Sequence, residues 1–67
     1  MANSNFTRSH GFYADKVAKM LVHGGEKVAN GYLDAVIRCD YNGDDKAEAV
    51  NFCLDVMVTA KAIAFNH

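Results

Sequence analysis

Polar residues recur every three or four positions from Asp15 to Arg38. At 100° per residue they fall within one arc of roughly 140°, and the rest of this segment forms an apolar face. The phase of the pattern before Gly24-Gly25 matches the phase after it. If a loop interrupted the helix, the polar residues after it would have no reason to continue the same angular pattern. The pattern therefore predicts one helix over about residues 10–39, running through the two glycines.

The glycines of "HGGEKVANG", residues 23–31, need a physical explanation in such a helix. Each costs about 1 kcal/mol relative to alanine in a helix interior, where no positive φ is required. A steric reason remains, because a missing Cβ lets a second helix approach closely. We expect Gly24 to face Ala60 on that second helix. The alternative, which the pattern leaves open, is a break at Gly24-Gly25 that divides the segment and gives three shorter helices.

A second helix is predicted over about residues 45–65. Asn42-Gly43 is typical of a turn. Asp45 and Glu48 then have the spacing of a capping box at a helix N-terminus. The two helices together predict an all-α, antiparallel two-helix hairpin.

Apolar residues cover about 240° of the second helix, and one neighbouring helix buries roughly 100–140° of such a surface. A monomer would leave a large apolar patch in water. We therefore expect two hairpins to pair as a homodimer, a four-helix bundle with two-fold symmetry. The residues expected in the core or the dimer interface are Val17, Leu21, Gly24, Val28, Tyr32, Phe52, Val56, Met57, Ala60 and Ile63.

The length of 67 residues allows one domain, and residues 1–8 are expected to be a flexible polar arm. A chain of this size depends on disulfides, a metal or oligomerisation for stability. Cys39 and Cys53 lie far apart along the predicted hairpin, so we expect no disulfide and treat both as small buried apolar side chains. Oligomerisation is the remaining route.

The sequence has no pattern typical of a signal peptide, and its most apolar run, residues 49–65, is too short and too charged to cross a membrane. We expect a cytoplasmic protein of a bacterial host, with no membrane partner.

No pattern of residues indicates catalysis or a cofactor. The glycines lack the spacing of a phosphate-binding loop. Asp40, Asn42 and Asp44 match the start of a calcium loop, but Asp45 and Asn51 stand where glycine and glutamate are required. We therefore expect a protein that is not an enzyme and has no metal or cofactor.

Six residues are predicted to bind a partner: Arg8, Phe12, Lys16, Lys19, Tyr41 and Asp44. Phe12 projects to the polar side of the first helix, and Tyr41 lies in an acidic turn. Aromatic side chains with charged rims are typical of binding hot spots. The alternative for each is local packing.

A basic stripe along the first helix, including Lys16, Lys19 and Lys27, is compatible with RNA binding. Asp15 and Glu26 interrupt the stripe, and the net charge of −1 is unusual for a dedicated nucleic-acid-binding protein. RNA is therefore the less favoured partner.

The layout of two helices, an acidic turn and a dimeric bundle resembles the Rop family of plasmid-copy-control proteins, which implies RNA binding. The segment "TRSHGFYADKVAKML", residues 7–21, together with the chain length, resembles the small phage-encoded anti-quorum-sensing proteins. That second resemblance implies a dimeric helical hairpin that inhibits host proteins. The implied targets are the DNA-binding domain of a LuxR-type quorum-sensing regulator and a type IV pilus assembly ATPase.

The expected function is that of a small dimeric protein-interaction module, an inhibitor (anti-activator) of such a host protein. The alternative is an RNA-binding helical bundle of Rop type. Acidic residues around Tyr41 would face the basic surface of a DNA-binding domain and compete with phosphates there.

Overall fold

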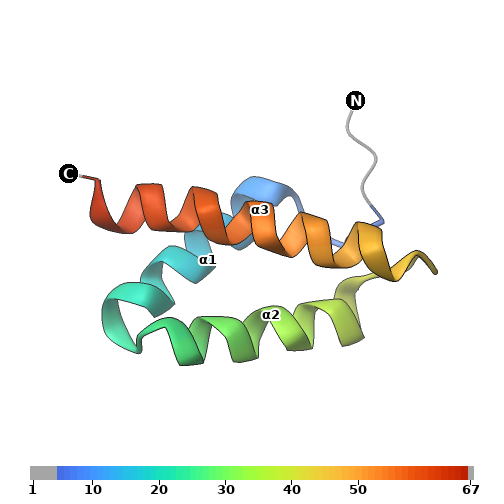
Figure 1. Cartoon of the computed structure of the whole chain (residues 1–67), viewed down its shortest axis with the longest axis horizontal. Coiled ribbons are helices and arrows are strands. Elements are labelled where there is room, and N and C mark those ends of the chain that lie inside the picture. The colour runs from blue at the N-terminus through green and yellow to red at the C-terminus, as the bar shows by residue number, and fades with distance from the viewer. Residues whose placement is uncertain (1–4, 67) are drawn as a thin grey trace.

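The computed structural model describes residues 5–66, and its regular elements are three helices: α1 (His10–His23), α2 (Glu26–Asp40) and α3 (Lys46–Phe65). No strand occurs within these residues; an isolated bridge joins Phe6 to Tyr41. The all-α prediction is confirmed. Figure 1 shows α2 and α3 both lying along the long axis and separated from each other, with α1 packed behind α3.

The prediction of one continuous helix over residues 10–39 was wrong, because the chain breaks at Gly24-Gly25. The backbone N–H groups of Gly24 and Gly25 both donate to the Met20 carbonyl, at 2.7 and 2.9 Å. Gly25 then takes φ 90° and ψ 177° and starts α2. This backbone region is essentially restricted to glycine. The alternative of three shorter helices is the one that the structure has.

The continuous polar phase has a simple physical origin. Both α1 and α2 turn their apolar sides toward the same core, where Val17 of α1 and Ala29 of α2 are fully buried. The polar pattern of the sequence continues across the two-residue link, but the buried face does not, because α2 buries Ala29, Leu33 and Val36 and leaves Val28 exposed. Periodicity alone therefore cannot distinguish one long helix from two that share a core.

The glycines do not open space for α3. The atoms nearest to a Cβ placed on Gly24 belong to Val28, not to Ala60, and the closest is 3.0 Å away. Gly24 itself is exposed. A Cβ on Gly31 would have no neighbouring atom within 4 Å. The expected packing of Ala60 against Gly24 is thus absent.

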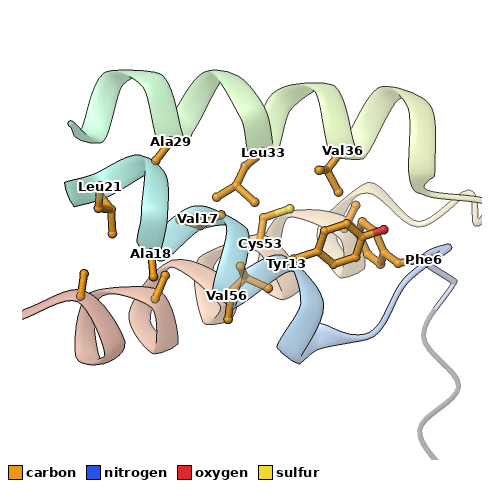
Figure 2. Close-up of a cluster of buried hydrophobic side chains, with 14 residues drawn as sticks. Phe6, Tyr13, Val17, Ala18, Leu21, Ala29, Leu33, Val36, Cys53 and Val56 are labelled. Atoms are coloured by element: carbon orange, nitrogen blue, oxygen red, sulfur yellow. The ribbon is translucent and has the colours of Figure 1, made fainter. Parts of the chain in front are cut away.

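α1 is the central element of the fold. It packs most extensively on α3 and also on α2, whereas α2 and α3 make few contacts with each other. The largest fully buried side chains are Tyr13 and Val17 of α1 and Val56 of α3. Figure 2 shows side chains from all three helices meeting in one cluster.

Polar side chains cap two of the helix starts. Ser9 Oγ accepts the Phe12 N–H at 3.2 Å, at the start of α1. Asp45 Oδ1 accepts the N–H groups of Ala47 and Glu48, at 3.1 and 3.3 Å, at the start of α3. The start of the second predicted helix and its Asp45 cap are therefore confirmed. Glu48 does not complete the capping box, because the Asp45 N–H donates to the Tyr41 hydroxyl instead.

The described part of the expected flexible arm is docked on the fold. Residues 1–4 lie outside the described residues. The Thr7 N–H donates to the Asp40 carbonyl at 3.1 Å, and the Asn42 N–H donates to the Asn5 carbonyl at 2.7 Å. Phe6 between them is only 8% exposed. Residues 5–8 are thus a packed segment rather than a free polar arm.

The backbone at Gly25 generates a stability prediction with a built-in control. Gly25→Ala should lower the free energy of unfolding by about 1–3 kcal/mol, because alanine is strained at this φ and ψ. Gly31→Ala, in an open position within α2, should raise it by up to about 1 kcal/mol. Urea unfolding followed by circular dichroism measures both. A continuous helix would instead be stabilised by both substitutions.

Candidate functional site

Three of the predicted partner-binding residues gather at the start of α1. The Arg8 guanidinium carbon lies 5.0 Å from the centre of the Phe12 ring, and Lys16 Nζ lies 5.5 Å from it. Phe12 is 37% exposed, and both cations are exposed. Cations over an aromatic face are attracted to its quadrupole. The result is a surface aromatic ring flanked by two positive charges.

The fourth residue, Lys19, lies one turn further along the same helix. With Lys16 it borders a hollow of about 350 Å³ between α1 and the start of α2. We call this the basic hollow; its lining residues are Lys16, Lys19, Met20, His23, Gly24 and Val28. Its rim is positively charged and its floor is apolar.

Tyr41 belongs to a hydrogen-bonded turn rather than to a free surface. Its hydroxyl accepts the Asp45 N–H at 3.1 Å and lies 2.8 Å from both the Asp45 carbonyl and Glu48 Oε1. Desolvation and the Glu48 carboxylate raise the pKa of this phenol. Its ring centre is 4.9 Å from that of Phe6. Within the chain Tyr41 therefore serves local packing, which was the alternative interpretation of this residue.

Asp44 is exposed in the same acidic turn. The six predicted residues therefore fall into two groups. Arg8, Phe12, Lys16 and Lys19 follow α1, whereas Tyr41 and Asp44 belong to the connection between α2 and α3.

An aromatic cluster packs against Tyr41 in the turn between α2 and α3. The Phe6 ring stacks on Phe52 of α3 with centres 4.1 Å apart and meets Tyr13 edge-on at 6.0 Å. Sequence reasoning missed Phe6 because it treated residues 1–8 as polar. The available signal was a single large apolar side chain within that polar segment.

The Tyr13 hydroxyl joins α1 to the end of α2. It donates to Asp40 Oδ2 at 2.8 Å and accepts the Arg8 N–H at 3.1 Å. Burial raises the pKa of Tyr13 to about 12, and the Asp40 carboxylate adds to the rise. The phenol therefore stays protonated and holds the carboxylate in place at neutral pH.

The outward side of α3 is apolar. We call Val50, Leu54 and Val58 the outer α3 face; these residues recur every four positions, so they lie along one side of the helix. All three are exposed, Leu54 by 60% and Val58 by 66%.

A groove of about 290 Å³ adjoins this face, between α2 and α3. The residues that line the groove are Asn30, Leu33, Asp34, Ile37, Val50, Cys53, Leu54 and Met57. The groove exists because α2 and α3 both pack on α1 and hardly touch each other.

The residues expected in the core or dimer interface divide into three groups. Val17, Leu21, Val56 and Ala60 are buried. Tyr32, Phe52 and Met57 are partly buried and pack against the core. Gly24, Val28 and Ile63 are exposed in the single chain. Ala29, Leu33 and Val36 form the buried face of α2, because the break at Gly25 sets its rotation.

The two cysteines differ in their surroundings. Cys53 is buried, and desolvation raises the pKa of its thiol. Cys39 is exposed, so the expectation that it is buried was wrong. Among residues 5–66 no three histidine, cysteine, aspartate or glutamate side chains are grouped so as to hold a metal ion. In the same range no helix is long and apolar enough to span a membrane.

No protein-family model, curated protein sequence or solved structure matches this chain. Three surfaces of the protein are available to a partner. They are the outer α3 face with its groove, the basic hollow beside Phe12, and the acidic turn.

The Tyr13 hydroxyl generates a prediction with a defined pH dependence. Tyr13→Phe should lower the free energy of unfolding at pH 7 by about 1–2 kcal/mol, because it leaves Asp40 and the Arg8 N–H without this partner. In the native protein the folded-state pKa is raised from 10.0 to about 12. The protonated Tyr13 phenol therefore contributes its full stabilisation below pH 10. This stabilisation is lost as the pH rises from 10 to about 12.

Urea unfolding at pH 7 and at steps from pH 9 to pH 12 measures both effects. Tyr13→Phe should show a shallower alkaline loss of stability than the native protein. Some loss should remain, because the pKa values of Tyr32 and Tyr41 are also raised. Equal alkaline slopes in the two proteins would show that Tyr13 is not the buried phenol described above.

Proposed function

We propose that the protein is a small dimeric protein-interaction module that inhibits a host protein. The observation that carries this proposal is the distribution of side-chain size on α3. Besides Cys53 and Val56, its buried positions hold only alanines, Ala49, Ala60 and Ala64, whereas Leu54 and Val58 are 60% and 66% exposed. A helix that serves a monomer alone would place its large apolar residues inward.

The outer α3 face is best matched by a second copy of the chain. Burying one leucine or valine side chain contributes about 1.5–3 kcal/mol, and a two-fold interface doubles every such contact. The adjoining groove offers Leu33, Ile37 and Met57 as further apolar contacts. We therefore replace the expected four-helix bundle of two hairpins with two three-helix protomers that meet through α3.

The acidic turn is the surface proposed to contact a basic target. Asp44, Asp45 and Glu48 are all exposed there. The Glu48 carboxylate is held by the Tyr41 hydroxyl, and the Asp45 carboxylate is held by the N–H groups that it caps. Such a fixed negative patch favours association with a positive surface and can compete with phosphates.

The target class comes from the resemblance of residues 7–21 to phage-encoded anti-quorum-sensing proteins. It is the DNA-binding domain of a LuxR-type regulator, with a type IV pilus assembly ATPase as the second implied target. The acidic turn suits the first of these, because that domain presents a phosphate-binding surface.

The dimer proposal predicts the effect of a charge on the outer α3 face. The native chain should sediment at twice its 7.3 kDa mass at tens of micromolar. Leu54→Glu should give monomers, because it buries an unpaired charge at the interface. Val22→Glu adds the same charge at an exposed position on α1, away from the outer α3 face and its groove, and should leave the dimer intact. A native chain that sediments as a monomer contradicts the proposal.

The inhibitor proposal predicts competition with DNA. The protein should displace a LuxR-type DNA-binding domain from its operator in a mobility-shift assay, and Asp44→Lys should weaken displacement several-fold. Asp15→Lys, on α1, is the control and should have little effect. A regulator that stays on its DNA and a pilus ATPase that keeps its activity would together overturn the target assignment. Direct binding of structured RNA by the protein would support the RNA-binding alternative instead.

A further inference from the structure

The basic hollow is a second surface that the dimer and the acidic turn leave unused. It lies between the end of α1 and the start of α2, and its floor is formed by Met20 and Val28. Val28 is 51% exposed. In the expected hairpin this valine would have been an interface residue, but the break at Gly25 leaves it at the surface.

Gly24 keeps the hollow open. A Cβ at this position would lie 3.0 Å from Cγ2 of Val28, which is tighter than an ordinary contact. Any larger side chain would project over the valine. The space is therefore a consequence of the residue type at position 24 and not only of the helix directions.

Neighbouring apolar features extend the surface in both directions along α1. Lys16 borders the hollow and also lies over the exposed Phe12 ring. Lys19 and His23 border a second hollow, of about 210 Å³, whose other lining residues are Ala18, Val22, Ile63 and Ala64. Val22 and Ile63 are exposed. Lys16 thus joins the Phe12 ring to the basic hollow, and Lys19 and His23 join the basic hollow to the second one.

The charged residues that line the two hollows are all basic, although Asp15 and Glu26 lie close by on the same helices. No acidic residue lines either hollow. Within residues 5–66 neither Lys16 nor Lys19 forms an ion pair, whereas Lys61 pairs with Glu26 at 2.7 Å. Arg8 adds a further positive charge beside Phe12. A complementary partner must bring negative charge together with apolar side chains.

We propose that this face binds an acidic amphipathic helix of a partner protein. Leucine-sized side chains of that helix enter the two hollows, and its carboxylates pair with Lys16, Lys19 and Arg8. Amphipathic helices bind apolar grooves through residues spaced three or four positions apart. The apolar floors favour such a peptide over nucleic acid, whose phosphates would use the lysines and leave the hollows empty. This inference goes beyond the proposed function, because the site uses neither the outer α3 face nor the acidic turn.

The test uses fluorescent 18-residue helical peptides and fluorescence anisotropy. The acidic probe carries leucine at every third or fourth position and glutamate elsewhere; the matched control carries lysine in place of glutamate. The acidic probe should bind the native protein with a dissociation constant on the order of 10–100 μM, weakening as salt is raised. The lysine peptide should not bind.

Two kinds of variant locate the site. Lys16→Glu with Lys19→Glu should weaken binding of the acidic probe at least about tenfold, while Lys46→Glu, at the start of α3, should change it less than about twofold. Gly24→Leu should also weaken it, by filling the hollow, without altering the circular dichroism spectrum. The paired lysine and glycine results distinguish insertion into the hollow from attraction by charge alone.

The proposal is overturned if the acidic probe does not bind, if the double lysine variant binds it as tightly as the native protein, or if Gly24→Leu leaves its affinity unchanged. It is also overturned if a structured RNA displaces the probe and binds more tightly. None of these outcomes affects sedimentation of the dimer or competition with DNA. Failure here is therefore distinguishable from failure of the proposed function.

Discussion

The backbone conformation of Gly25 determines how the rest of the chain packs. At φ 90° and ψ 177° it ends one helical run and starts the next in a new direction. As a result α1 becomes a central helix with α2 and α3 on different sides of it. A 30-residue helix would instead have met the last helix along its full length. The separation of α2 from α3, and the groove between them, follow from this one residue.

The same break links the three proposed surfaces to the core. α1 contributes Tyr13 and Val17 to the interior, so its opposite side is free to carry Phe12 and the lysines. α3 packs inward through Val56, Cys53 and three alanines, which leaves Leu54 and Val58 outside. The acidic turn is held between Phe6 and the α3 cap. Each surface is therefore the exposed side of a helix or turn whose opposite side packs against the core.

Local sequence signals predicted the parts of the fold that short-range chemistry decides. The start of α3 follows from Asp45, whose carboxylate caps the first turn. The all-α class follows from the hydrophobic period. Sequence named Arg8, Phe12 and Lys16 separately as partner-binding residues, and only the structure brings them together around the Phe12 ring. The helix break was considered from the glycine pair but not favoured, because phase continuity cannot report a change of axis.

Other features depend on tertiary contacts that no local pattern reports. Phe6 is buried because Phe52 and Tyr41 are there to receive it, and these lie over 30 residues away in sequence. Val28 is exposed because α2 is rotated after Gly25, which turns Ala29 and Leu33 inward instead. The basic hollow is likewise a product of two helix ends and a missing side chain.

The most direct test of this account is the backbone conformation of residues 20–30 in solution, measured by NMR on isotopically labelled protein. We predict that helical carbon chemical shifts stop near His23 and resume at Glu26, and that scalar couplings show a positive φ at Gly25. Nuclear Overhauser contacts should also join the Tyr13 ring to Phe6 and Phe52. Uninterrupted helical shifts from His10 to Cys39 would contradict the account, because no break would then exist to separate α2 from α3.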